Sequence, residues 1–289
     1  MKELVVISGK GGTGKTSIVA SFAALAEDKV MADCDVDAAD MHLILNPSVK
    51  IEEDFEGGKE AILDRGKCTE CGRCMEVCRY DAISLTDEKH EIEAINCEGC
   101  GVCAYFCPYE AIEMKTKIAG KWFLSDTRHG PLVHAKLGIA EDNSGKLVAK
   151  VREEAKKSAE QNEYKLIIID GPPGIGCPVI ASITGTGLVL IVTEPTVSGF
   201  HDLERVSELA DHFRINKMIC INKYDLNSDM TKKIEEFSSS HNIEVAAKIP
   251  YDNNFTKAQI KGKSLIEYCN GNTSKSIEDM WEIIYEKIK

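Results

Sequence analysis

Short apolar runs alternate with longer amphipathic stretches along most of the 289-residue chain. These runs predict strands buried on both faces, because apolar residues are not interrupted by regularly spaced polar ones. The clearest runs are Leu4–Ile7, Lys29–Asp33, Leu166–Asp170, Leu188–Thr193 and Met218–Lys223. Helical spacing predicts helices at Ser17–Leu25, Ser144–Gln161, about Gly199–Phe213 and Ser276–Lys289. Alternating strands and helices predict an α/β fold, a doubly wound and mostly parallel sheet.

The apolar pattern lapses between Ile51 and Lys59, where the chain is acidic and contains two neighbouring glycines. Such a lapse predicts a border between domains. Two further strands, Lys121–Ser125 and Leu132–Leu137, are expected to pair after this region. We therefore expect one domain from residues 1–59 and 118–289, with a second, small α+β domain inserted at residues 60–117.

Composition narrows the class of protein. A hydrophobic content of 43% and a charged content of 28% are typical of a globular protein. Since no run is long enough to span a bilayer and the N-terminus has no signal pattern, we expect a cytoplasmic protein without a membrane partner. The net charge of -12 argues against non-specific binding to nucleic acid, so no nucleic-acid partner is expected.

Eight of the twelve cysteines form two runs with the same spacing, C-x2-C-x2-C-x3-C. This spacing is typical of bacterial two-cluster ferredoxins, in which the fourth cysteine of each run ligates the other cluster. One [4Fe–4S] cluster is thus expected on Cys68, Cys71, Cys74 and Cys107, and the other on Cys97, Cys100, Cys103 and Cys78. Structural zinc is the weaker alternative, because zinc sites use two pairs of ligands. The first run has Arg79 where a proline is usual, which could alter the local turn.

The string Gly9-Lys10-Gly11-Gly12-Thr13-Gly14-Lys15-Thr16 follows the first strand and precedes the first helix. This context predicts a phosphate-binding loop, whose backbone N–H groups face the phosphates at a helix N-terminus. ATP is expected on the loop residues Gly11, Gly12, Thr13, Gly14, Lys15, Thr16 and Ser17. Lys15 is expected to reach the β- and γ-phosphates, and the Thr16 hydroxyl to bind Mg²⁺.

Acidic residues follow two of the other predicted strands, where ligands bind in doubly wound sheets. Asp170 ends a buried strand and precedes Gly-Pro-Pro-Gly174, and we expect it to hold Mg²⁺ through water. Its alternative role is to cap the following segment. After the second strand come Asp33, Asp35 and Asp37. Asp35 is the preferred functional residue, and a polar turn with Asp40 as a helix cap is the alternative.

The loop with its second lysine resembles the deviant P-loop of the MinD/ParA ATPases, a family that includes the nitrogenase iron protein. The resemblance implies an ATP-dependent dimer, as a homodimer or with a related subunit. It also implies that Lys10 reaches the partner's nucleotide and that Asp35 positions the attacking water. On chemistry alone Lys10 could equally be a solvated charge.

The same resemblance implies roles for residues later in the chain. Gly174 is expected to offer its N–H near the γ-phosphate, Asn222 to pair with the adenine, and Pro250 and Asp252 to line the base. Cys177 follows Asp170 at the spacing of a cluster-ligating cysteine in the nitrogenase iron protein. It is expected at the dimer interface as a ligand of a metal or cluster, and the alternative is that it is a small buried thiol.

Two functions are compatible with these patterns. The first is an ATPase that couples a nucleotide-switched dimer to electron transfer through two [4Fe–4S] clusters, with a redox partner. The alternative is a carrier of iron–sulfur clusters or metal, with an apo-metalloprotein as the acceptor. In both, ATP and Mg²⁺ are the expected cofactors besides the clusters.

Overall fold

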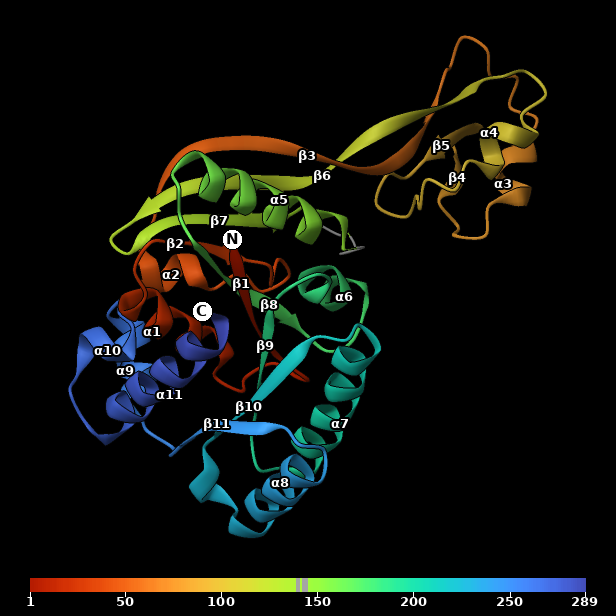
Figure 1. Cartoon of the computed structure of the whole chain (residues 1–289). Helices are drawn as coiled ribbons and strands as arrows, with labels where there is room; N and C mark the ends of the chain where they lie inside the picture. The colour runs from red at the N-terminus through yellow and green to blue at the C-terminus, as the bar shows by residue number, and fades with distance from the viewer. Residues whose placement is uncertain (139–140, 142–144) are drawn as a thin grey trace. The chain divides into compact units, whose positions relative to one another are not determined.

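The computed structural model describes residues 1–138, 141 and 145–289, which divide into two compact units. The first unit comprises residues 1–53, 122–136 and 143–289, and the second comprises residues 54–121 and 137–142. The division at residues 53 and 54 lies inside a continuous strand rather than in a loop. Each unit has its own helices and its own buried residues (Figure 1).

A nine-stranded sheet runs through the first unit in the order β11-β10-β9-β1-β8-β2-β7-β6-β3. All neighbours from β11 to β7 are parallel, which confirms the expected α/β fold with a mostly parallel sheet. Strands β6 and β7 are joined by two residues, a connection that only antiparallel strands allow. The strands are β1 Lys2–Ser8, β2 Lys29–Asp33, β3 Ser48–Leu63, β6 Ile112–Thr127, β7 Gly130–Leu137, β8 Leu166–Pro173, β9 Leu188–Thr193, β10 Asn216–Asn222 and β11 Glu244–Ile249.

Helices cover both faces of this sheet (Figure 1). One face carries α1 Lys15–Leu25, α2 Met41–Leu45, α9 Asn254–Ile260, α10 Leu265–Tyr268 and α11 Asn272–Ile288. The other face carries α5 Lys146–Gln161, α6 Cys177–Ile183, α7 Val197–His212 and α8 Ser228–Ser240. The expected start of α5, Ser144, lies outside the described residues. None of the described helices is both long and apolar enough to cross a membrane.

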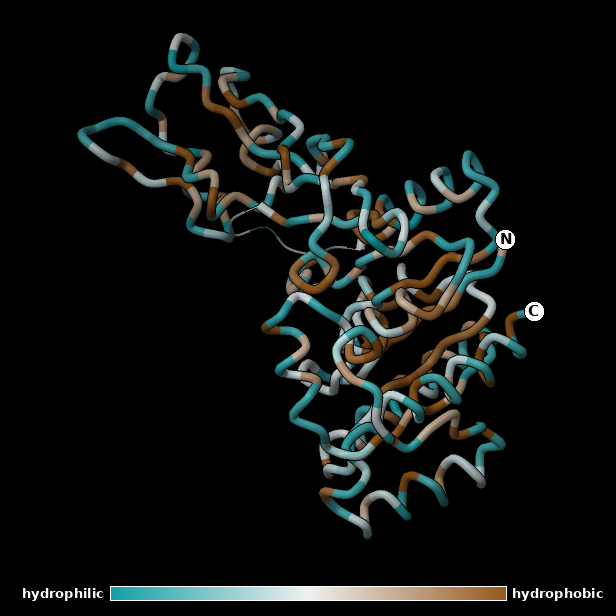
Figure 2. Tube along the Cα trace, turned by 90° about the vertical axis from the view of Figure 1, so that its left-hand side faces the viewer, coloured by the Kyte–Doolittle hydropathy of each residue, from teal (hydrophilic) through white to brown (hydrophobic). Residues whose placement is uncertain are grey.

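Residues 51–59, over which the apolar pattern lapses, are not a loop. These residues belong to β3, a strand of 16 residues whose first seven are all exposed. Because neither face of this part of β3 is buried, its side chains carry no apolar alternation that a sequence pattern could reveal. Figure 2 shows the contrast with the central strands of the first unit, along which hydrophobic residues gather.

The second unit contains a short antiparallel hairpin and two one-turn helices. The hairpin strands are β4 Ile83–Thr86 and β5 Lys89–Ile92, and the helices are α3 Arg73–Val77 and α4 Val102–Phe106. Each helix begins after a glycine with positive φ, 76° at Gly72 and 78° at Gly101. The two cysteine runs thus have the same local backbone.

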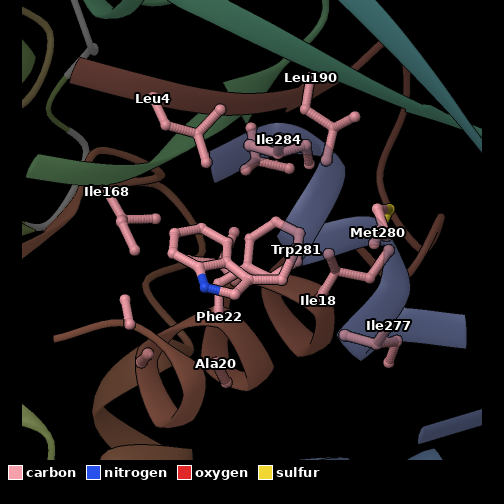
Figure 3. Packing of buried hydrophobic residues seen from close by; sticks show 14 of the residues in the cluster. Leu4, Ile18, Ala20, Phe22, Ile168, Leu190, Ile277, Met280, Trp281 and Ile284 are labelled. Carbon is pink, nitrogen blue, oxygen red and sulfur yellow. The ribbon is translucent and has the colours of Figure 1, made fainter. Parts of the chain in front are cut away.

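The core of the first unit lies between α1, α11 and the sheet (Figure 3). Phe22 of α1 is fully buried, and its ring centroid lies 5.0 Å from that of Trp281 on α11. Ile277, Met280 and Ile284 of α11 are also fully buried. The C-terminal helix therefore packs on the core, as the spacing of its apolar residues predicted.

Trp281→Ala should lower the free energy of unfolding by about 3–5 kcal/mol, since it removes a large buried side chain and leaves a cavity beside Phe22. Chemical denaturation followed by circular dichroism measures this loss. Ile260→Ala is the control, because Ile260 is 78% exposed and its truncation should change stability by less than about 0.5 kcal/mol. Equal effects of the two substitutions would contradict the described core.

Candidate functional site

The carboxyl ends of the parallel strands meet at one edge of the sheet, where they surround a cavity of about 490 Å³. The loop between β1 and α1 forms one wall. Gly12 and Gly14 have positive φ, 79° and 89°, which side chains rarely adopt, so this backbone depends on glycine. The cavity is lined by every residue at which ATP was expected in this loop: Gly11, Gly12, Thr13, Gly14, Lys15, Thr16 and Ser17.

Lys15 lies between two carboxylates that come from other strands. Its Nζ is 2.5 Å from Asp170 Oδ1, at the end of β8, and 3.3 Å from Asp35 Oδ2, after β2. Burial of Lys15 disfavours its charge, but these carboxylates outweigh burial and raise its pKa. Thr16 Oγ1 donates to the other oxygen of Asp170, at 2.7 Å. The two expected Mg²⁺ ligands, Thr16 and Asp170, are therefore in contact.

Asp33 lies behind this cluster and is fully buried. Burial is the main cause that raises its pKa well above the usual range, and the nearby Asp170 carboxylate adds to the effect. The backbone N–H groups of Asp35 and Met41 donate to its two oxygens, at 3.2 and 3.3 Å. The proposed capping role of Asp40 is wrong, because Asp40 makes no side-chain cap and Asp33 takes the first N–H of α2 instead.

Lys10, the second lysine of the loop, contacts residues of its own chain. Its Nζ lies 2.5 Å from Glu194 Oε1, after β9, and within hydrogen-bonding distance of Thr196 and Ser198. Glu194 also binds Lys223 through its second oxygen, at 3.0 Å. Burial opposes the charge of Glu194, but hydrogen bonds from the two lysines lower its pKa. Glu194 was not singled out from the sequence.

The far wall of the cavity includes Asn222, Pro250 and Asp252, the three residues expected at the base. Asn222 is buried, and its Nδ2 donates to the carbonyl of Thr13 at 2.7 Å. This hydrogen bond also stabilises the phosphate-binding loop. Three lining residues from α9 were missed: Phe255, Thr256 and Gln259. They follow no strand end and belong to no motif, so no sequence signal marked them.

Two other expected residues lie elsewhere. The N–H of Gly174 donates to the carbonyl of Ser8 at 2.9 Å, and Gly174 does not line the cavity, so its contact with a γ-phosphate stays a prediction. Cys177 is exposed at the start of α6. The alternative in which Cys177 is a small buried thiol is therefore wrong.

The eight cysteines of the second unit line two separate small cavities. One is lined by Cys68, Cys71, Cys74 and Cys107, and the other by Cys78, Cys97, Cys100 and Cys103. The fourth cysteine of each run thus faces the cavity of the other run. Arg79 does not distort the turn, since Cys78 (φ -74°, ψ 119°) and Cys107 (φ -74°, ψ 111°) match.

Most other lining residues are apolar, mainly alanine, isoleucine, leucine and tyrosine, while Thr69, Arg73 and His90 also line the first cavity and Glu98 the second. Among the described residues, no three His, Cys, Asp or Glu side chains converge closely enough to hold a single metal ion.

Asp33→Asn should change how stability depends on pH. The raised pKa of Asp33 means that its ionised form costs stability at high pH, and that this cost disappears as pH falls through the folded pKa towards the unfolded value of about 4. Wild type should therefore lose stability relative to the variant as pH rises from the unfolded value of about 4 towards neutral pH. Denaturation of the nucleotide-free protein across this range measures the difference. The exposed Asp229→Asn is the control, and a pH-independent difference for Asp33→Asn would contradict the assignment.

Comparison with solved structures identifies proteins with a similar fold. MinD cell division protein of Aquifex aeolicus superposes with a TM-score of 0.57 at 20% identity, covering 99% of this chain and 98% of that one. Apo McdA of Cyanothece gives a TM-score of 0.59 at 16% identity, covering 98% and 99%. At these identities the likeness concerns the fold alone.

Sequence relatives extend over nearly the whole chain. An uncharacterised protein of Methanocaldococcus jannaschii, MJ0578, is 35% identical over 291 residues, which cover 99% of this chain and 97% of that protein. A second one, MJ0579, is 27% identical over 93% of this chain. The profile of the CobQ/CobB/MinD/ParA nucleotide-binding domain matches residues 4–266. The chain therefore belongs to the CobQ/CobB/MinD/ParA nucleotide-binding family.

Proposed function

We propose that this protein is a dimeric ATPase that couples a nucleotide switch to electron transfer through two [4Fe–4S] clusters. The observation that carries this proposal is the division of eight cysteines between two cavities, with the fourth cysteine of each run in the other set. Family membership supports the ATPase part, and the cysteine sets support the redox part.

The residues around the main cavity fit Mg-ATP. The Thr13 hydroxyl is buried there without a hydrogen-bond partner among the described residues, as expected of a group that binds a ligand. Lys15 would bind the phosphates, and Thr16 and Asp170 would hold Mg²⁺, which stabilises the charge that develops on the phosphate oxygens. ATP phosphates would compete with Asp170 and Asp35 for the Lys15 ammonium, so ATP binding would change this ion pair.

The cysteine sets fit [4Fe–4S] clusters better than zinc. Each set combines three cysteines of one run with the fourth of the other around a mostly apolar cavity, whereas structural zinc sites use two pairs of ligands. When bound, the clusters would supply one-electron redox chemistry at low potential. The eight cysteines would hold them, and the apolar walls would limit the access of water.

Lys10 would act in the partner's site, and Glu194 would compete for it within the chain. Lys10→Ala should lower ATP hydrolysis on the order of 100-fold, as for the loss of a group that stabilises transition-state charge. The exposed Lys232→Ala is the matched control and should leave the rate unchanged. A steady-state assay of phosphate release measures both.

Mixing two inactive variants separates action across the dimer from action within one chain. A dimer of Lys10→Ala with Lys15→Ala keeps one complete site only if Lys10 works on its partner's nucleotide. The mixture should therefore regain part of the wild-type activity. If no activity returns although the chains form mixed dimers, Lys10 works within its own chain.

A carrier of clusters or metal is the second candidate function, and the exposed position of Cys177 favours it. An exposed thiol at the start of a helix can contact an acceptor, and firmly held clusters do not need one. The acceptor in this case would be an apo-metalloprotein rather than a redox partner.

One experiment distinguishes the two functions. The anaerobically purified protein should contain about eight irons per chain, as two [4Fe–4S] clusters require. Mg-ATP should shift a cluster midpoint potential relative to ADP by about 60 mV, which corresponds to about 1.4 kcal/mol for one electron. An unchanged potential, together with ATP-dependent passage of iron to an apo-acceptor, would favour the carrier. Iron-free protein with intact ATPase activity would refute both.

A further inference from the structure

The second unit consists of two halves related by a constant shift of 29 residues. Cys68 thus corresponds to Cys97, helix α3 to helix α4, and the cavity-lining Leu63 to the cavity-lining Ile92. Most residues that line one cavity therefore have a counterpart in the wall of the other. A departure, a position at which the two counterparts differ, distinguishes one cavity from the other.

Two departures lie next to each other, Glu70 in the first half and His90 in the second. His90 lines the cavity of Cys68, Cys71, Cys74 and Cys107, whereas its counterpart in the other cavity wall is Ala61. Glu70 contacts His90, and the counterpart of Glu70 is Gly99. A Cβ atom at Gly99 would lie 1.9 Å from the carbonyl oxygen of Lys59, so the second half has no room for an acid there.

Glu70 holds the imidazole of His90 in one orientation. The same carboxylate oxygen, Oε2, accepts from the backbone N–H of His90 and lies 2.7 Å from Nδ1. His90 is only 3% exposed, and its Nε2 lies 3.7 Å from the position of a Cβ atom on Gly72, within the first cysteine run. Glu70 also donates its N–H to Cys68 Sγ at 3.4 Å, while Arg65 lies 3.8 Å from its second oxygen.

We propose that Glu70 and His90 are positioning residues that give the cluster of Cys68, Cys71, Cys74 and Cys107 a reduction potential different from that of the second cluster. This inference rests on the proposed function, because it requires both clusters. The pair would make the two clusters inequivalent, so that one of them is reduced before the other.

The physical reason is that the protein sets cluster potentials through charge, hydrogen bonds to sulfur and exclusion of water. Glu70 orients an imidazole that lines one cavity, while Gly99 and the methyl group of Ala61 occupy the matching places at the other, which Glu98 also lines. The carboxylate opposes the arrival of an electron nearby, because like charges repel. Its removal should therefore raise the potential of the nearby cluster.

Anaerobic potentiometric titration followed by electron paramagnetic resonance tests the proposal. Wild type should show two reduction steps at different potentials. Glu70→Gln, which keeps the shape of the side chain, should shift one step upward and leave the other in place. The double variant Glu70→Gly with His90→Ala copies the second cavity at these two positions and should bring the two steps closer together.

Cysteine variants assign the steps. Cys71 and Cys100 are exposed counterparts, so Cys71→Ser should alter the step that Glu70→Gln moves, and Cys100→Ser the other one. Glu113→Gln is the control, since it makes the same charge change on an exposed strand residue close in sequence to Ile112 of the same cavity wall. It should move neither step.

The outcomes separate this inference from the function on which it rests. Protein without cluster iron would refute the proposed function before the potentials are considered. Protein with eight irons whose two potentials stay fixed in Glu70→Gln and in the double variant would refute only the role of this pair. Equal shifts of both steps would also refute it, because the effect would then not be confined to one cavity.

Discussion

The ion pair between Lys15 and Asp170 connects the ends of the central strands. Lys15 comes from the loop after β1, Asp170 ends β8, and Asp35, which also binds Lys15, follows β2. A buried ammonium needs such partners, because an unpaired charge in this position would cost several kcal/mol. ATP phosphates would compete for the same ammonium. The segments after β2 and β8 would therefore respond to nucleotide through a single side chain, without requiring a long chain of contacts.

The sequence predicted the central strands well because they are buried on both faces. Strands such as β1 and β9 contain uninterrupted apolar runs, Leu4–Ile7 and Leu188–Val192, which the sequence pattern reveals directly. The first part of β3 contains no such run, since its residues are exposed and mostly polar. Its strand conformation comes from pairing with a neighbour, and pairing partners far apart in the chain are not visible in local patterns.

The residues of the candidate site also form two groups, those that a local sequence pattern marks and those that only the tertiary structure brings to the site. The glycines and lysines of the P-loop are marked by local spacing, and all of the loop residues expected to bind ATP line the cavity. The residues contributed by α9 and the partner of Lys10 are determined by tertiary packing. Glu194 contacts Lys10 only because β9 lies beside β1 in the sheet, so this carboxylate could be found only after the strand order was known.

The close approach of Gly99 to the carbonyl of Lys59 has a consequence for how the two halves can diverge after a duplication. The first half can lose its acidic side chain by a single substitution at Glu70, with no steric obstacle. The second half cannot gain one at Gly99 unless the backbone at Lys59 moves away. Point mutation can therefore erase the difference between the halves more easily than it can reverse it, so a lineage that keeps the difference keeps it in one orientation.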